Sequence, residues 1–261
     1  MKHIRAKKKL GQHFLMDLNI ARRIAETLDH NNCEKVLEIG PGMGVLTQFL
    51  IAKISDLRLI EIDSESVNYL KRKYIKLENK VIEGDFLRLD LKKVFGMKPF
   101  AIIGNFPYNI STQIIFKTLE YRAQIPFFSG MFQKEVAERI CELPGSRKYG
   151  ILSVLTQLFY QTDFLFEVPP GVFKPPPKVN SAVIRLVRLE NFNLECDEKL
   201  LFQIVKLSFQ QRRKTIRNSL KVMNIPKKLT EDAIFDLRPE VLQGSDFIEL
   251  TKSISHGNIS N

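Results

Sequence analysis

Short apolar runs alternate with amphipathic segments through the first half of the chain. The apolar runs have the length of buried strands and cover residues 35–38, 57–61, 80–82, 99–103 and 127–132. Between them, segments such as 64–77 and 111–121 carry apolar residues at helical spacing. This alternation predicts an α/β fold in which helices cover both faces of a parallel sheet.

The pattern changes in the second half. Residues 159–168 and 182–189 predict two strands that can pair antiparallel, separated by the proline-rich segment 169–177. Because proline cannot continue a helix or a central strand, we expect this segment to be an exposed, stiff loop.

Strand-like runs end near residue 189, and helical spacing replaces them. Residues 198–209 predict one helix, and 212–221 predict a second with a basic face. We therefore predict two domains, residues 1–189 and a small helical domain of residues 190–261. The tail after Ser253 carries few apolar anchors, and we expect it to be disordered.

A glycine-rich turn follows the first predicted strand. Gly40 and Gly42 belong to a GxGxG run, in which the missing Cβ atoms allow the backbone to approach a ligand closely. A dehydrogenase is the alternative, but its GxGxxG spacing is absent here. Glu38 precedes the turn and would repel a phosphate. A carboxylate suits a cation, so we expect the sulfonium and ammonium groups of S-adenosylmethionine.

Two further acids stand at predicted strand ends. Glu61 ends the second strand about twenty residues beyond the turn, where a carboxylate can accept hydrogen bonds from ribose hydroxyls. Asp85 follows the third strand and can accept a hydrogen bond from the adenine amino group of the cofactor. Both are expected at the carboxyl edge of the sheet.

The run Asn105-Phe106-Pro107-Tyr108 follows the fourth predicted strand at the same edge. The amino nitrogen of adenine is a poor nucleophile because its lone pair is delocalised into the ring. The Asn105 side-chain oxygen and the Phe106 carbonyl could hold its two N–H groups, while Pro107 fixes the turn. Tyr108 offers a ring for base stacking. A flipped-out adenine needs a second wall, for which Phe173 is the candidate.

Charge is concentrated in two segments. The formal net charge is +11, and cations cluster in the N-terminal arm and between Lys206 and Lys228, a stretch without Asp or Glu. Such clustering favours nucleic-acid binding over a uniformly basic surface. The candidate RNA-binding residues are Lys7, Lys8, Lys9, Arg212, Arg213, Lys214, Arg217 and Lys221.

Composition narrows the remaining possibilities. Cys33, Cys141 and Cys196 form no CxxC pair and lack a nearby His, so we expect neither a disulfide framework nor a metal site. The N-terminus lacks the apolar core of a secretory signal, and no apolar stretch is long enough to span a bilayer. A cytoplasmic monomer that does not bind membranes is the expectation.

Taken together, these motifs resemble the ribosomal RNA adenine N6-dimethyltransferase family over nearly the whole chain. The resemblance includes the segments 8–15, 38–42, 61–63, 84–86, 105–111, 133–139, 173–179 and 209–215. It implies a Rossmann-like class I S-adenosylmethionine methyltransferase domain with a small C-terminal helical domain that binds RNA. The segment 212–221 looks most like the bacterial branch that modifies the small subunit.

This branch dimethylates two adjacent adenosines in the 3′-terminal hairpin loop of 16S rRNA. The small ribosomal subunit is therefore the implied partner, with a role in ribosome assembly. The resemblance also implies that His13 and Leu15 close over the cofactor, with Gly40, Glu61, Asp85 and Asn105 completing its site. The family commonly has Asn at the position of His13 and Leu or Ile at that of Phe106.

Three alternatives remain open. A non-enzymatic assembly factor would keep the fold and bind subunits, but it has no need of both the glycine turn and the 105–108 run. Relatives that modify large-subunit rRNA share the catalytic motifs. A DNA adenine methyltransferase fits the catalytic motif alone.

Overall fold

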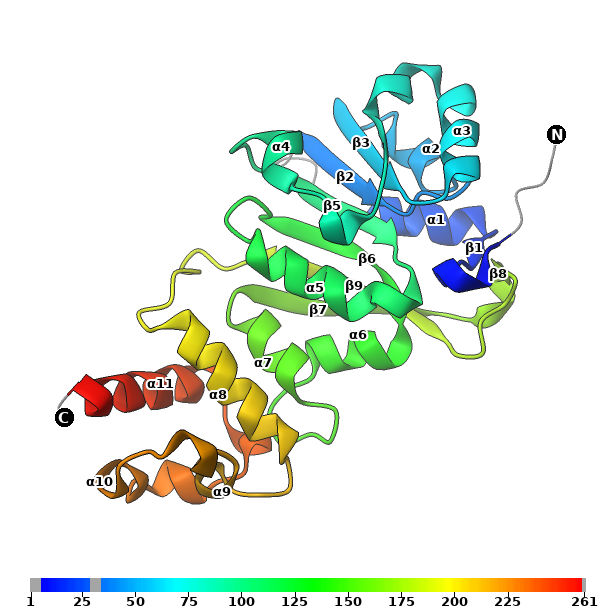
Figure 1. The fold of residues 1–261 in the computed structure, drawn as a ribbon. Coiled ribbons are helices and arrows are strands. Elements are labelled where there is room, and N and C mark those ends of the chain that lie inside the picture. Colours follow the sequence, from blue (N-terminus) through cyan, green and yellow to red (C-terminus); the bar gives the residue numbers. More distant parts are fainter. Residues whose placement is uncertain (1–5, 29–33, 260–261) are drawn as a thin grey trace. The chain divides into compact units, whose positions relative to one another are not determined.

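The computed structural model describes residues 6–28 and 34–259 (Figure 1). Cys33 and the arm cations Lys2 and Arg5 lie outside the described residues. The chain divides into two compact units. The first comprises residues 1–137 and 162–188, and the second comprises 138–161 and 189–261.

A seven-stranded sheet in the order β4-β3-β2-β5-β6-β9-β7 forms the centre of the first unit (Figure 1). Strands β2 to β6 pair in parallel, and β9 joins β6 antiparallel. The sheet strands are β2 (Lys35–Ile39), β3 (Asp56–Glu61), β4 (Val81–Glu83), β5 (Ala101–Asn105), β6 (Phe127–Gln133), β7 (Tyr160–Val168) and β9 (Ser181–Arg188). All seven predicted strands are present, and their ends differ from the prediction by at most two residues.

Both faces of this sheet are covered, because neighbouring residues of one strand point to opposite faces and are both buried. On β2, Val36 and Leu37 are 1% and 0% exposed, and on β6, Phe127 and Phe128 are 6% and 0% exposed. The helices of the unit are α1 (Leu18–Ala25), α2 (Thr47–Leu50), α3 (Ser64–Lys73), α4 (Leu91–Phe95), α5 (Ser111–Glu120) and α6 (Lys134–Cys141), the last of which continues into the second unit.

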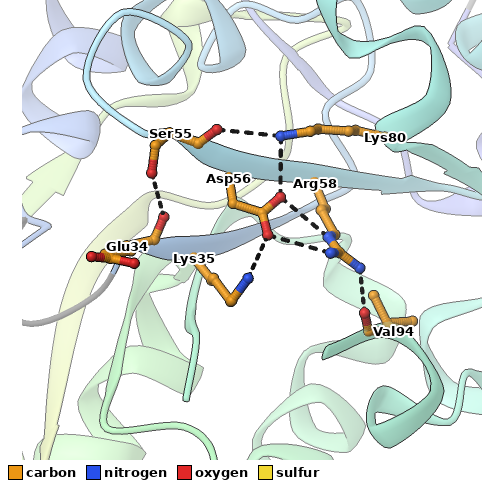
Figure 2. A network of polar contacts seen from close by, with 7 residues as sticks. All are labelled: Glu34, Lys35, Ser55, Asp56, Arg58, Lys80 and Val94. Atoms are coloured by element: carbon orange, nitrogen blue, oxygen red, sulfur yellow. Dashed lines mark hydrogen bonds and ion pairs between the residues drawn. The ribbon is translucent and has the colours of Figure 1, made fainter. Parts of the chain in front are cut away.

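An ionic network fixes the beginning of β2 against β3 (Figure 2). Asp56 is the ladder partner of Lys35 and lies 2.8 Å from its Nζ atom. Arg58 and Lys80 contact the same carboxylate at 3.3 and 3.2 Å. Burial alone would raise the pKa of Asp56, but hydrogen bonds from the three cations hold it well below its usual range. The network therefore favours one strand register at neutral pH.

The N-terminal segment pairs with the proline-rich segment. Strand β1 (Phe14–Leu15) runs antiparallel to β8 (Phe173–Lys174), and the Met16 amide donates to the Val172 carbonyl at 2.8 Å. The proline-rich segment is therefore only partly the exposed loop that we predicted, because Phe173 is 4% exposed and belongs to the hydrophobic core.

The second unit is helical. Its elements are α7 (Ile151–Gln157), α8 (Glu198–Gln210), α9 (Ile216–Ser219), α10 (Lys227–Thr230) and α11 (Gly244–Ile259), with short 3-10 turns at Lys221–Met223 and Ala233–Asp236. Helix α8 packs against α7 and α11, and its apolar side buries Leu201, Ile204 and Val205 completely. This is the helix predicted for residues 198–209.

Two predictions for the second unit are wrong. Residues 212–221 do not form one helix, because α8 ends at Gln210 and a turn with Lys214 N donating to Gln211 O precedes α9. The tail is not disordered from Ser253, because α11 continues to Ile259 and Ile254 is 1% exposed. A single buried isoleucine supplies the anchor that the prediction did not recognise.

Candidate active site

A pocket opens at the carboxyl edge of the parallel strands, as the sequence predicted for an α/β ligand site. Three groups of residues line it: the N-terminal segment, the glycine turn with the acids beside it, and the 105–108 run. Its lining includes His13, Leu15, Glu38, Gly40, Gly42, Glu61, Asn105, Phe106, Pro107 and Tyr108. These ten predicted site residues are therefore brought together within the first unit.

The glycine turn adopts a conformation that few other residues tolerate. Gly40 and Gly42 have φ angles of +66° and +55°, in the left-handed region. A Cβ atom on Gly42 would also lie 3.0 Å from the Phe14 ring, so this position keeps backbone and N-terminal segment close together. The turn thus presents bare main chain to the pocket.

Two buried carboxyl groups lie beside the turn. Glu38 is 1% exposed and accepts a hydrogen bond from the Thr47 hydroxyl at 2.7 Å. Burial, opposed by this hydrogen bond, raises the pKa of Glu38 to about 8. Glu61 is 4% exposed and accepts from the amides of Gly42 and Asp63, both at 3.0 Å. Its pKa is also raised, mainly by burial.

These carboxyl groups fit a cationic ligand. Among the described residues, no cation forms an ion pair with Glu38 or Glu61, although a buried carboxylate is costly without a partner. The sulfonium and ammonium groups of S-adenosylmethionine would supply the missing positive charge. Glu61 is held in place by two backbone amides and retains lone pairs that can accept from ribose hydroxyls.

The 105–108 run presents two oxygen acceptors. The Asn105 amide donates from Nδ2 to the His13 carbonyl at 3.2 Å, which orients its Oδ1 atom away from that contact. The Phe106 amide donates to the Met131 carbonyl at 3.1 Å. No described residue donates to the Phe106 carbonyl or to Asn105 Oδ1. Two acceptors in adjacent residues are what the two N–H groups of an adenine amino group require.

The buried ring of Phe106 fixes this main chain. Phe106 is 1% exposed and stacks on Phe128 with a centroid distance of 5.0 Å. It occupies space that Cβ atoms at Gly104 and Gly130 would fill, since such atoms would lie 2.9 and 2.4 Å from the ring. The Phe at this position therefore acts as a core side chain, and only its carbonyl is available to the pocket.

Tyr108 is held by both its ring and its hydroxyl. The ring stacks on His13 at 5.3 Å with an interplanar angle of 27°, and the hydroxyl lies 2.5 Å from Ser181 Oγ. Burial raises the pKa of Tyr108, so the hydroxyl is neutral at physiological pH. His13 donates through Nδ1 to the Pro175 carbonyl at 2.7 Å, which ties the proline-rich segment to the pocket.

Two of the twelve predicted catalytic and cofactor-binding residues do not line the pocket. Phe173 has its ring in the core, so in this structure it offers no open face to a base. Asp85 follows β4, accepts from the Leu87 amide at 2.9 Å and keeps a side chain that is 33% exposed. Its carboxylate remains accessible at the same edge of the sheet.

The predicted RNA-binding cations fall into two classes. Lys7 pairs with Asp63 and Glu65, Arg212 with Glu240, and Arg217 with Asp236. The other five predicted cations, Lys8, Lys9, Arg213, Lys214 and Lys221, are exposed and form no ion pair with any residue that the structure describes. Arg213 precedes α9, Arg217 lies in it and Lys221 begins the 3-10 turn after it, so the spacing of four residues does not define one helical stripe.

Some residues of the site escaped the sequence analysis. Thr47 binds Glu38, Ser181 binds Tyr108, and Gln12 accepts from the Lys7 amide at 2.8 Å. Only Ser181 has a partner far away in the sequence, 73 positions from Tyr108. Gln12 and Thr47 have partners within ten residues, but a lone polar side chain carries no sequence signal for such a contact.

Among the described residues, no helix combines the length and the apolar composition of a membrane span.

Comparisons with known proteins agree with this geometry. The family model described as ribosomal RNA adenine dimethylase matches residues 3–244. Ribosomal RNA small subunit methyltransferase A of Flavobacterium johnsoniae is 58% identical over 261 residues, covering 100% of both chains. The protein of the same name from Bacteroides thetaiotaomicron is 54% identical over 255 residues, covering 97% of this chain and 96% of that one.

Two solved structures show the same fold. A dimethyladenosine transferase from Plasmodium falciparum aligns with a TM-score of 0.80 at 25% identity, over 94% of this chain and 98% of that one. The 23S rRNA methyltransferase ErmE aligns with a TM-score of 0.71 at 28% identity, over 93% and 99%. With the paired acceptors, the buried acids and a match over nearly its whole length, the chain belongs to the ribosomal RNA adenine dimethylase family of S-adenosylmethionine-dependent methyltransferases.

Proposed function

We propose that this enzyme dimethylates the N6 atoms of two adjacent adenosines in the 3′-terminal hairpin loop of small-subunit rRNA. The observation that carries the proposal is a pair of acceptors, Asn105 Oδ1 and the Phe106 carbonyl, that no described residue engages. They lie beside two buried acids that form no ion pair with any described residue. The acceptors suit the N–H groups of an exocyclic amine, and the acids suit a sulfonium donor.

The residues act mainly by positioning. When bound, S-adenosylmethionine supplies an electrophilic methyl group on a positively charged sulfur. Asn105 and the Phe106 carbonyl would accept the two amino protons, which favours a tetrahedral nitrogen whose lone pair points away from the ring. After transfer, the nitrogen carries the positive charge and loses a proton to water, so no basic side chain is needed. Fixing the two reactants in this way can account for a large part of the rate enhancement.

Tyr108 supports the base in this proposal. Its ring lies against His13, and its hydroxyl is fixed by Ser181. A base that enters from the RNA would stack on the accessible part of this aromatic pair, an interaction worth about 1–3 kcal/mol. Phe173 would contribute to stacking only if the proline-rich segment moved its ring out of the core.

Sequence relatives favour the small subunit over the large one. The structural neighbours include one dimethyladenosine transferase and one 23S rRNA enzyme at similar identity, so the fold does not discriminate between them. The relatives with more than half of their residues identical are named for the small subunit. A cytoplasmic site of action and binding to assembling subunits are part of the same proposal.

An Asn105→Ala variant tests the proposed chemistry. It should lose at least about 100-fold in methyl transfer to unmethylated small subunits, because one of the two acceptors is gone, while cofactor binding is largely kept. Asn68→Ala, an exposed change on α3, is the matched control and should retain wild-type activity. Normal transfer by Asn105→Ala would refute the proposed role of the 105–108 run.

A further inference from the structure

A second cavity lies entirely within the C-terminal unit. It has a volume of about 350 Å³ and is bounded by α9, the 3-10 turn Lys221–Met223, α10 and the 3-10 turn Ala233–Asp236. Leu220 and Phe235 form its floor, and both are 1% exposed. Pockets for small organic groups begin at about 300 Å³ and combine an apolar interior with a few polar groups.

The rim supplies these polar groups. Asn218 offers a side-chain amide, and Thr230 offers a hydroxyl that donates to the Lys227 carbonyl at 2.9 Å and can still accept. Amide and hydroxyl groups beside an apolar floor are suited to the edges of a nucleobase.

The rim is also positively charged. Lys221 is exposed and has no ion pair among the residues that the structure describes. Arg217 donates from Nε and Nη2 to Asp236 Oδ1 at 3.0 and 2.8 Å, which fixes the guanidinium and leaves Nη1 uncommitted. Asp236 matches the charge of Arg217, and no Asp or Glu occurs between positions 206 and 228, so Lys221 is the rim cation that remains to attract an anion.

We propose that this cavity binds one unpaired nucleotide of the rRNA, with its base over Leu220 and Phe235 and its phosphate at Lys221 and Arg217. The inference rests on the proposed function, since it names a contact between the same enzyme and its RNA. It adds a binding site for a second nucleotide, separate from the methylated adenine, within a unit that contains none of the catalytic residues.

The cavity favours a nucleotide over two simpler occupants. A phosphate alone would use the cations but leave the apolar floor without a partner. An apolar side chain from a protein partner would use the floor but leave Lys221 without an anion. A nucleotide satisfies both, and unpaired RNA presents such groups in loops and bulges.

Three variants of the full-length protein test the proposal by equilibrium binding to unmethylated small ribosomal subunits. Thr230→Phe fills the cavity without changing charge, Lys221→Ala removes the rim cation, and Lys228→Ala removes an exposed cation that does not line the cavity. We expect Thr230→Phe and Lys221→Ala each to weaken binding about tenfold or more. Lys228→Ala should weaken binding by no more than about threefold.

Thermal unfolding of each variant shows whether it is folded. A folded Thr230→Phe variant that binds like the wild type overturns the proposal, as does an equal loss for Lys221→Ala and Lys228→Ala. If Thr230→Phe does not fold, ultraviolet crosslinking of wild-type protein to subunits decides. Mass spectrometry should find a nucleotide attached within residues 217–235, and crosslinks confined to other peptides would overturn the proposal.

The binding assay does not depend on methyl transfer. Wild-type protein that binds subunits without methylating them would refute the proposed function, while the comparison of cavity variants would still test the nucleotide site.

Discussion

Replacing Glu38 by Gln separates two effects of this buried carboxyl group, one on folding stability and one on cofactor binding. Gln keeps the shape of the side chain and can still accept the hydrogen bond from Thr47, but it cannot ionise. The pKa of Glu38 rises from 4.5 to about 8 because the ionised form is buried at the base of the pocket.

The sign of the effect on stability follows from this shift. A carboxyl group whose pKa is raised on folding stabilises the folded state below its unfolded pKa, and this contribution is lost as pH rises through the folded pKa. For Glu38 the loss occurs between pH 4.5 and about pH 8 and amounts to about 5 kcal/mol above that window. The Gln variant does not undergo this loss.

Urea unfolding of the cofactor-free proteins measures the difference. At pH 5 the two proteins should have nearly equal free energies of unfolding. At pH 7 the Gln variant should be more stable by about 3 kcal/mol, and at pH 9 by about 5 kcal/mol. A difference that stays constant from pH 5 to pH 9, or a variant that is less stable throughout, would refute this account of Glu38.

Cofactor binding should change in the opposite direction. At pH 8 the Gln variant should bind S-adenosylmethionine at least about tenfold more weakly, because a hydrogen-bonded contact between the acid and a cation is lost. Wild-type affinity should also increase from pH 6 to pH 8, as Glu38 releases its proton on binding, and this increase should be absent in the variant. Isothermal titration calorimetry gives both results.

Three further changes test other parts of the structure. Asp56→Asn should lower the free energy of unfolding by about 1–2 kcal/mol at pH 7, because three cations stabilise the ionised carboxylate of Asp56. In urea titrations the difference should begin to shrink as the pH falls below the unfolded pKa of about 4, and it should vanish only when the pH is below the lowered folded pKa. Lys117 Nζ donates to the Leu87 and Leu89 carbonyls and so holds the segment after Asp85. Lys117→Met should therefore raise KM for the cofactor with little effect on kcat, and Lys117→Arg should keep KM close to the wild-type value. An unchanged KM for the Met variant would contradict this role. Phe106→Ala should destabilise the protein by about 3–5 kcal/mol in thermal unfolding, whereas a loss of less than 1 kcal/mol would contradict its position in the core.

The centre of the fold was predictable because its signals are local. The apolar runs mark the strands, and the glycine turn and the 105–108 run follow strand ends directly, so their common position follows from the parallel sheet alone. The position of Glu38 in the pocket was predictable in the same way, because it stands directly before the glycine turn in the sequence.

Long-range contacts were not predictable in the same way. Strand β1 has only two residues and pairs with Phe173 and Lys174 about 160 positions later, and no periodicity marks so short a strand. Phe173 looked like a loop residue because of its proline neighbours, but pairing with Leu15 places its ring in the core.

The prediction of one basic helix over residues 212–221 was wrong for a local reason, although the apolar residues there have helical spacing. Ile216 and Leu220 have helical spacing and both are buried, yet the five residues before Ile216 are all polar or charged and give the chain no apolar face to bury. A turn there separates α8 from α9. Residues 138–161 group with the C-terminal helices, and neither charge nor spacing in that segment indicates it.

Nucleoside mass spectrometry after methyl transfer tests the central claim most directly. Unmethylated small ribosomal subunits are incubated with the enzyme and isotope-labelled S-adenosylmethionine, and the rRNA is then digested and mapped. Labelled N6,N6-dimethyladenosine should appear at two adjacent positions near the 3′ end with the wild type and be absent with Asn105→Ala. Label in any other nucleoside, or none at all, would contradict the account.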